Sequence, residues 1–266
     1  MNYMTLTQDD LFRIAEALYE AQQMRNPIDP ITEIYPNITV EEAYKIQLIN
    51  IDKRTRQGQK IIGKKIGLTS KSMQKLFGVN EPDYGHLTDT MYVDDHGFMR
   101  LSELIQPRIE AEIAFILKDN LKGPGVTVVD VLRAVEGVVP ALEVIDSRIK
   151  NWKIKIQDTI ADNASAAKFV IGNKISKITD TDLRTVGMIF EVNGDIVATA
   201  SGAAVLGNPL IAIAWLANKL AQYNTYLKAG EIILSGSLIA AVEIRPGDYV
   251  RATFDRLGDV SVKFVT

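Results

Sequence analysis

Three glutamates have the residue type and spacing to bind a divalent metal ion. Glu110 and Glu112 lie two residues apart in QPRIEAEIAFIL, and Glu143 lies in PALEVIDSR. Alternate residues of a strand leave the same face, so the first two carboxylates would point the same way. Carboxylate oxygens without a nearby His or Cys suit Mg²⁺ or Mn²⁺. The alternative interpretation is an exposed strand face, which is where strand carboxylates usually lie.

Two further residues could take part in proton transfer or charge stabilisation. Lys65 lies in an apolar segment bounded by glycines, GKKIGLTS, where an ammonium group could stabilise a developing oxyanion. The alternative interpretation of Lys65 is a solvent-facing charge, since one of two adjacent lysines usually lies at the surface. Asp83 in EPDYG could act as a general acid or base. Because Pro-Asp-x-Gly is also common in turns, the residues by themselves favour a turn at this position.

The elements that would position the glutamates can be predicted from the apolar pattern. Residues 109–117 alternate as a strand, with apolar side chains on one face and Glu110 and Glu112 on the other. The glutamate face continues with Ala114 and Ile116, which suggests that it is partly covered. Carboxylates brought together in a covered place repel one another and lose hydration, and a divalent cation would compensate. A short helix at 127–136 and a strand at 138–145 would follow.

Two N-terminal helices and a later hairpin have clear local signals. Thr7 with Asp10, and Thr39 with Glu42, are capping-box pairs that begin helices, the second running to about Gly58. The prolines in residues 26–37 indicate a loop between them. Asn193-Gly194 predicts a hairpin turn, and Asn208-Pro209 predicts the start of a helix to about residue 223.

This order of elements predicts an α+β fold with a mixed or antiparallel sheet, because regular βαβ alternation is missing. We expect an N-terminal helical cap at residues 1–60 and a catalytic domain at residues 61–266. No internal repeat, G-x-G-x-x-G pattern or P-loop is present, so nucleotide cofactors have no support.

The composition excludes several classes of function. The chain has 266 residues, 30 Lys plus Arg against 33 Asp plus Glu, and no basic run, so no nucleic-acid partner is expected. It has no cysteine and only two histidines, His86 and His96, which excludes disulfides, thiolate catalysis and histidine-rich metal sites. The segment MNYMTLTQDD lacks the signature of a signal peptide, and we find no apolar stretch of membrane-spanning length. We therefore expect a cytoplasmic protein with no membrane partner.

Several long segments resemble one family of enzymes. They are GKKIGLTSK (63–71), EPDYGHLTD (81–89), QPRIEAEIAFIL (106–117), GPGVT (123–127), EVIDSRIKNWKIKIQDTIADNAS (143–165), GAAVLGNP (202–209) and LKAGEIILSGS (227–237). The chain resembles the 2-hydroxypenta-2,4-dienoate (2-keto-4-pentenoate) hydratases of the fumarylacetoacetate hydrolase superfamily, over most of its length after residue 60.

The resemblance implies a fold, an activity and roles for named residues. The fold would be a roll of mixed β-sheets with an N-terminal helical segment, assembled into homo-oligomers. The activity would be addition of water to a small 2-keto acid during aromatic catabolism. Glu110, Glu112 and Glu143 would be Mg²⁺ or Mn²⁺ ligands, and Lys65 and Asp83 would be active-site residues. Ser165, in the DNAS segment, and Ser237, in the SGS segment, would bind substrate.

The related 4-oxalocrotonate decarboxylases are the alternative, because they bind a similar 2-keto acid at the same metal. Asp83 in its P-D-Y-G context, WKIKIQDTIADNAS and ILSGS (233–237) are hydratase-like, whereas E-A-E at 110–112 and AAV at 240–242 are at least as decarboxylase-like. We weigh the polar positions more heavily and expect a hydratase.

Other readings have less support. Superfamily hydrolases of carbon–carbon bonds generally use a Glu–His pair, which neither histidine here matches, and a non-enzymatic relative should lose the ligand set. An association with a neighbouring pathway enzyme is conceivable, but nothing in the sequence supports it.

Overall fold

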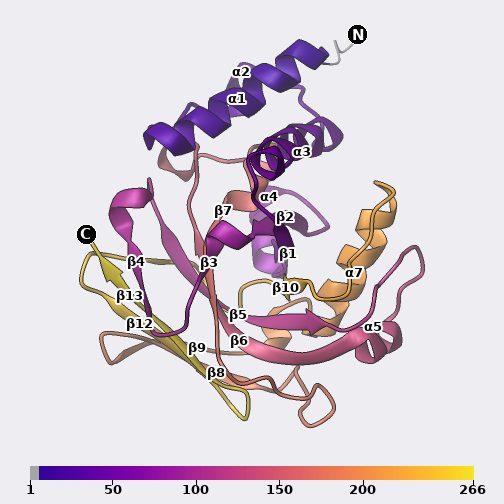
Figure 1. Cartoon of the computed structure of the whole chain (residues 1–266), viewed down its shortest axis with the longest axis vertical. Coiled ribbons are helices and arrows are strands. Elements are labelled where there is room, and N and C mark those ends of the chain that lie inside the picture. The colour runs from indigo at the N-terminus through magenta and orange to yellow at the C-terminus, as the bar shows by residue number, and fades with distance from the viewer. Residues whose placement is uncertain (1–5) are drawn as a thin grey trace.

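A computed structural model describes residues 6–266 of the chain. The N-terminal helices gather at one end of the molecule, later helices lie along one side, and β-strands cross the middle and fill the opposite end (Figure 1). The predicted α+β class is confirmed. Residues 1–5, which form part of the segment considered for a signal peptide, lie outside the described range.

The helices of the described range agree with most of the local signals. They are α1 (Gln8–Met24), α2 (Ile31–Ile34), α3 (Val40–Arg56), α4 (Lys71–Phe77), α5 (Val128–Ala134), α6 (Ile156–Ala161) and α7 (Pro209–Ala221). Thr7 and Thr39 close the predicted capping boxes at α1 and α3. The prediction of an unbroken loop at 26–37 is wrong, because one turn of helix, α2, follows Pro30. Helices α4 and α6 were not predicted from the sequence.

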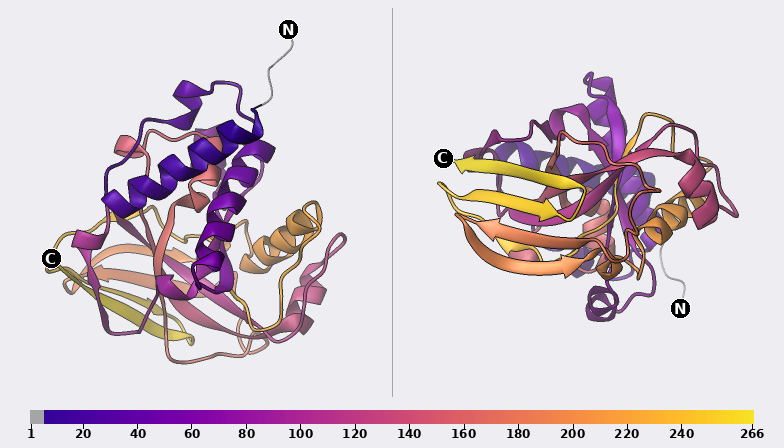
Figure 2. Two further views of the ribbon diagram at one scale, coloured as in Figure 1. Left: turned by 45° about the horizontal axis from the view of Figure 1, so that its top comes forward. Right: turned by 90° about the horizontal axis from the view of Figure 1, so that it is seen from below.

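The strands form two sheets (Figure 2). In residues 6–266, the larger sheet has the order β2 (Asp83–Thr88), β1 (Ile61–Gly67), β10 (Ile232–Leu234), β5 (Arg108–Leu117), β6 (Val135–Ile145), β7 (Ala166–Ile171) and β3 (Tyr92–Val93), with β11 (Val242–Glu243) paired to β5. The smaller sheet has the order β4 (Gly97–Arg100), β13 (Gly258–Val265), β12 (Tyr249–Phe254), β8 (Gly187–Val192) and β9 (Asp195–Ser201). Parallel and antiparallel pairs occur in both sheets, as expected for a mixed arrangement.

The turn between β8 and β9 confirms the predicted hairpin. Asn193 and Gly194 connect the two strands with φ angles of 56° and 89°. Both values lie in the left-handed region that a two-residue turn of this kind requires, and Asn and Gly tolerate it best.

Strand β5 has two chemically different faces. Ile109, Ala111, Ile113, Phe115 and Leu117 all belong to the main hydrophobic core, as their alternation predicts. On the other face, Ala114 packs in a smaller apolar cluster with residues of β6, β7 and β10. The glutamate face is therefore covered at one end by apolar packing, and the carboxylates lie at the other end.

The apolar segment around α7 belongs to the core. Gly202–Ala221 has the length and mean hydropathy of a membrane-spanning helix, so the expectation that no stretch approaches that length is wrong. Half of this segment is buried inside the protein. Its helical part, α7, has 13 residues and is capped by Asn208, whose side chain accepts a hydrogen bond from Leu210 N. At 1.5 Å per residue this helix is too short to cross a bilayer, so we assign it as a core helix.

The N-terminal helices share the core of the sheets. Leu11 and Ile46 belong to the same cluster of buried side chains as Ile66 and Ile109. The buried side chain of Gln47, on α3, donates hydrogen bonds to Tyr84 O and Ile160 O. The helical cap thus packs directly on the sheet that carries the candidate site, and its division from the rest at residue 60 stays a prediction.

Candidate active site

The three glutamates come together on one face of the larger sheet. Glu110 and Glu143 are directly opposite each other on the antiparallel strands β5 and β6. Each of the three, including Glu112, offers a carboxylate oxygen, and these oxygens all lie within 4.8 Å of one another. The clustering predicted from the sequence is confirmed, and the alternative of an exposed strand face is wrong.

Burial makes this cluster electrostatically costly. Glu112 and Glu143 are fully buried. Glu112 Oε1 and both carboxylate oxygens of Glu143 accept no hydrogen bond from any described residue. Burial raises the pKa of Glu110 to about 7 and also raises those of Glu112 and Glu143. Repulsion from neighbouring carboxylates adds to the shifts of Glu110 and Glu112.

These residues fit a divalent metal ion. Carboxylate oxygens that lack a hydrogen-bond donor are free to coordinate, and an all-oxygen donor set suits a hard cation such as Mg²⁺. A cation would also offset the repulsion among the three carboxylates. The backbone N–H of Gly236 donates to Glu112 Oε2 at 2.7 Å and so holds that side chain in place while its Oε1 stays free.

Lys65 provides a positive charge beside the cluster. The side chain extends from β1, is buried, and lies with its Nζ 3.3 Å from Glu143 Oε2. Nζ also donates a hydrogen bond to Ala164 O at 2.9 Å. Burial acts to lower its pKa, but Glu143, Asp83 and the other two glutamates together outweigh burial and raise it. Lys65 is therefore held as an ammonium ion, and the interpretation as a surface lysine is wrong.

Asp83 lies beside Lys65 on the neighbouring strand. It is the first residue of β2 and is paired with Gly67 of β1, so the interpretation as a turn residue is wrong. A Cβ at Gly67 would lie 2.2 Å from Asp83 Oδ1 and 3.6 Å from Lys65 Nζ, so any other residue at this position would displace the carboxyl group. Burial raises the pKa of Asp83 to about 6, against the lowering effect of Lys65.

The DNAS segment holds an unusual backbone conformation that forms one wall of the site. Asn163, Ala164 and Ser165 have φ angles of 55°, 50° and 56°, in the left-handed region that costs free energy for residues other than glycine. Asn163 stabilises it by bonding both backbone groups of His86, accepting from N at 2.8 Å and donating to O at 2.9 Å. This conformation turns Ala164 O toward Lys65.

The two predicted serines differ in what their hydroxyl groups contact. Both line the cavity at the site. Ser165 Oγ is buried with no hydrogen-bond partner among residues 6–266, so it is free to bind a ligand. Ser237 Oγ donates to Ile239 O at 2.7 Å, which makes it a part of the local loop structure.

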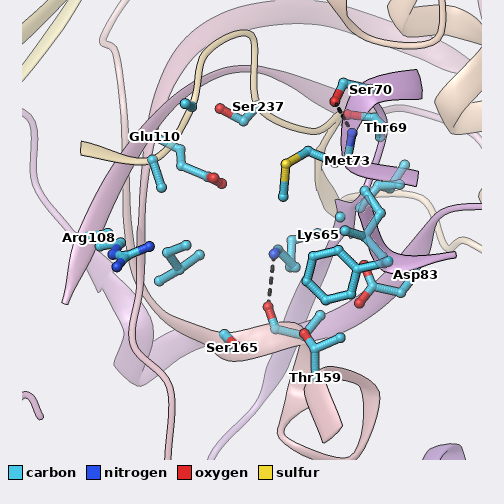
Figure 3. A pocket seen from close by; sticks show the side chains of 18 of the residues that line it. Lys65, Thr69, Ser70, Met73, Asp83, Arg108, Glu110, Thr159, Ser165 and Ser237 are labelled. Carbon is cyan, nitrogen blue, oxygen red and sulfur yellow. Dashed lines mark hydrogen bonds between the residues drawn. The ribbon is translucent and has the colours of Figure 1, made fainter. Parts of the chain in front are cut away.

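Lys65, Asp83, Glu110 and both serines line one cavity of about 650 Å³, whereas the fully buried Glu112 and Glu143 do not line it. Lys65 lies in the middle, with Glu110 and Arg108 on one side and Met73 and Asp83 on the other (Figure 3). Arg108 was not predicted as a site residue, although it precedes Glu110 by two residues and so leaves the same strand face. The roles of Gly67 and of the wall formed by α4 were not predicted either, because the sequence carried no comparable signal for them.

Comparison with known proteins places this site in a family. The profile of the Fumarylacetoacetate (FAA) hydrolase C-terminal family matches residues 76–265, which include all three glutamates and Asp83. The chain belongs to this family. Among relatives in the fumarylacetoacetate hydrolase family, a 2-hydroxypent-2,4-dienoate hydratase of Pseudomonas putida is 50% identical over 212 residues, or 79% of this chain and 96% of that protein.

Two further family members match almost the whole chain. A 2-hydroxyhexa-2,4-dienoate hydratase of Comamonas testosteroni is 46% identical and covers 94% of this chain and 95% of its own. A solved structure of 4-oxalocrotonate decarboxylase from Pseudomonas putida G7, complexed with magnesium and adipate, is 40% identical with a TM-score of 0.95. That match covers 98% of this chain and 99% of the other. The fold and the recognised family are therefore confirmed, and both activities occur among close relatives.

Proposed function

We propose that this protein is a metal-dependent hydratase that adds water to 2-hydroxypenta-2,4-dienoate, or a tail-substituted form of it, to give a 4-hydroxy-2-oxo acid. The observation that carries the proposal is the buried carboxyl group of Asp83, which lines the same cavity as Glu110 but lies outside the cluster of the three glutamates. The names of relatives at 44–50% identity support the same activity.

Glu110, Glu112 and Glu143 would hold Mg²⁺ or Mn²⁺. When bound, the ion would supply Lewis-acid polarisation of the substrate 2-oxygen and a template for its carboxylate. A relative's structure contains magnesium, which supports the first of the two metals.

Lys65 would stabilise negative charge on the substrate 2-oxygen. Its ammonium group is fixed by Ala164 O and Glu143, so it needs little reorganisation as charge develops. A buried cation acts more strongly than one in water, because the surrounding protein screens it less. Ser165, whose hydroxyl is free, would bind the substrate on the same wall.

Asp83 would move the protons. In the first step the dienol loses its O–H proton and C5 gains one, which gives an α,β-unsaturated ketone. In the second step the oxygen of water bonds to C4 and a proton reaches C3. A carboxyl group with a pKa of about 6 can both donate and accept a proton near neutral pH.

A 4-oxalocrotonate decarboxylase is the second candidate, favoured by the match to the solved decarboxylase over 98% of the chain. Loss of CO₂ from that substrate also places negative charge on the 2-oxygen, so Lys65 and the three glutamates would serve either reaction. Asp83 distinguishes the two candidates, because water addition requires an acid–base group near C4 and C5.

The deciding experiment supplies the protein with 2-hydroxypenta-2,4-dienoate and, separately, with 2-hydroxymuconate, first with Mg²⁺ and then with excess EDTA. We expect Mg²⁺-dependent formation of 4-hydroxy-2-oxopentanoate, no CO₂ from the dicarboxylate, and loss of turnover in EDTA. The Asp83→Asn variant should lose about 10²-fold or more in kcat while it still binds Mg²⁺. Release of CO₂ from the dicarboxylate with an inert dienoate would show a decarboxylase.

The proposal also includes a cytoplasmic location and assembly into homo-oligomers, as the family resemblance implies. Light scattering on the purified protein would measure its mass in solution. A mass equal to that of one chain, 29.4 kDa, would contradict the assembly.

A further inference from the structure

The two ends of the cavity differ in chemistry. Glu110, Arg108 and Lys65 supply charged groups on one side and at the centre, and the other side is formed by α4, the segment before it and the carboxyl group of Asp83 (Figure 3). Arg108 already lies 4.9 Å above the Trp152 ring and 3.8 Å from a carboxylate oxygen of Glu243. The charged end is thus the end suited to the acid group and 2-oxygen of a substrate.

Helix α4 presents an apolar face to the cavity. Met73, Leu76 and Phe77 are spaced three and four residues apart, so they share one helical face, and all three line the cavity. Ser70 caps the helix by accepting a hydrogen bond from Met73 N, and Gly78, with a φ of 65°, ends it. The short helix is therefore well defined at both ends.

This apolar face is not covered by the rest of the protein. Leu76 is 75% exposed and Met73 is 39% exposed, whereas the buried residue of α4 is the polar Gln74, which bonds Leu68 O. This short helix buries a glutamine and exposes a leucine at the cavity, so its apolar side is available to a ligand. Exposed apolar patches in binding grooves have the same arrangement.

The cavity is also larger than a five-carbon acid needs. A volume of about 650 Å³ lies within the range for drug-sized ligands, and the acid head would occupy only its charged end. The cations of α4, Lys71 and Lys75, do not line the cavity, and Lys71 donates to Gln74 Oε1. A negatively charged tail at the α4 side would meet the hydroxyl groups of Thr69, Ser70 and Ser72 but no cation of α4 to offset its lost hydration.

We propose that Met73, Leu76 and Phe77 bind a hydrocarbon tail on the substrate, so that the preferred substrates are 2-hydroxy-2,4-dienoates with an alkyl or aryl group at C5 and not dicarboxylates. The catalytic part of this inference rests on the proposed function, but binding of the tail does not.

Binding of saturated 2-oxo acids tests the tail site without any reaction. The Mg²⁺-loaded protein would be titrated in a calorimeter with 2-oxopentanoate, 2-oxohexanoate, 2-oxooctanoate and 2-oxoadipate. We expect Kd to fall about threefold to fourfold for each added methylene, since each buried one contributes about 0.8 kcal/mol. The dicarboxylate should bind at least about tenfold more weakly than 2-oxohexanoate, because its second charge would be desolvated with no cation of α4 beside it.

A matched pair of variants locates the effect. Leu76→Asn should flatten the dependence of Kd on chain length, and Leu76→Phe should keep it. Leu132→Asn is the control, since Leu132 is an exposed leucine on α5, another seven-residue helix, and does not line the cavity. The control should keep the wild-type dependence. Circular dichroism would confirm that the variants fold, as expected for exposed positions.

The outcomes separate this inference from the proposed function. A Kd that does not change with chain length, tightest binding of 2-oxoadipate, or an equal effect of Leu76→Asn and Leu132→Asn would each overturn the tail site. If the chain-length dependence is present and kcat/KM for the dienoates also rises with the C5 tail, both proposals stand. If the dependence is present but no dienoate is hydrated, the tail site stands and the hydratase proposal fails.

Discussion

Glu110 on β5 and Glu143 on β6 are direct cross-strand neighbours, with Glu112 one step further along the same face. Like charges at such positions repel, because side chains directly opposite each other on antiparallel strands are in contact. Lys65, 3.3 Å from Glu143, offsets one of the three charges. The remaining excess of negative charge in a buried place is the physical reason that this arrangement calls for a bound cation.

Replacing Glu112 by glutamine should abolish turnover and leave the chain folded. The change removes a buried carboxylate that repels its neighbours, so the melting temperature without metal should equal or exceed that of the wild type. Mg²⁺ at about 100 times its Kd should stabilise the wild type by about 2.7 kcal/mol and the variant far less. Thermal unfolding with and without Mg²⁺, beside an activity assay, measures both effects. Full turnover in the variant would be incompatible with the proposed metal site.

Replacing Gly67 by alanine should impair catalysis by displacing Asp83. The new Cβ would lie 2.2 Å from Asp83 Oδ1, so the carboxyl group must move. We expect kcat to fall about 10²-fold, near the effect of Asp83→Asn, while the thermal shift by Mg²⁺ is kept. Gly187→Ala, on β8, is the matched control, because its Cβ would meet no atom within 4 Å. Wild-type kcat in the Gly67 variant would show that catalysis does not depend on the position of the Asp83 carboxyl group.

His86 should make the protein less stable as the pH falls below neutral. Burial lowers the pKa of this imidazole to about 3, whereas in the unfolded chain it is about 6.5. The unfolded state therefore binds the proton first, so the stability contributed by neutral His86 is complete above about pH 6.5 and is lost progressively toward pH 3. By linkage the loss between pH 6.5 and pH 5 is about 2 kcal/mol.

Urea unfolding of the wild type and His86→Gln at pH 7.5 and pH 5.0 checks this prediction. Other buried groups titrate in the same range, so the quantity to compare is the difference between the two proteins at each pH. The variant should lose about 2 kcal/mol less than the wild type on acidification. Parallel losses in both proteins would assign the acid sensitivity to other groups.

Replacing Asn163 by alanine should destabilise the DNAS segment. The variant loses two hydrogen bonds to the backbone of His86. It also puts alanine, which tolerates a positive φ less well than asparagine, at a position with a φ of 55°. We expect a loss of about 2–3 kcal/mol in the free energy of unfolding, together with lower activity, since Ala164 O would no longer be aimed at Lys65. Chemical denaturation measures the first and kcat the second.

Asn224→Ala separates the two causes in that variant. Asn224 has a similar φ of 54°, and its cost reports the conformational effect without the two hydrogen bonds to His86. It should destabilise the protein by about 1 kcal/mol at most. Equal losses at positions 163 and 224 would show that the hydrogen bonds of Asn163 contribute nothing measurable.

Local patterns in the sequence determined much of the fold. The capping boxes at Thr7 and Thr39, the alternation through β5 and the Asn193-Gly194 turn were all predictable, because each depends on interactions within a few residues. The same alternation placed Glu110 and Glu112 on one face. The types of the three carboxylates were enough to suggest a hard metal ion.

Tertiary structure alone decided where the other groups lie. Register between β5 and β6 puts Glu143 opposite Glu110, and pairing of β1 with β2 makes Asp83 a strand residue against Gly67. Burial of Lys65 and the exposed apolar face of α4 depend on contacts between segments far apart in the chain. Strand register, burial and cavity shape arise from such long-range contacts, and the residue type and spacing within one segment do not contain them.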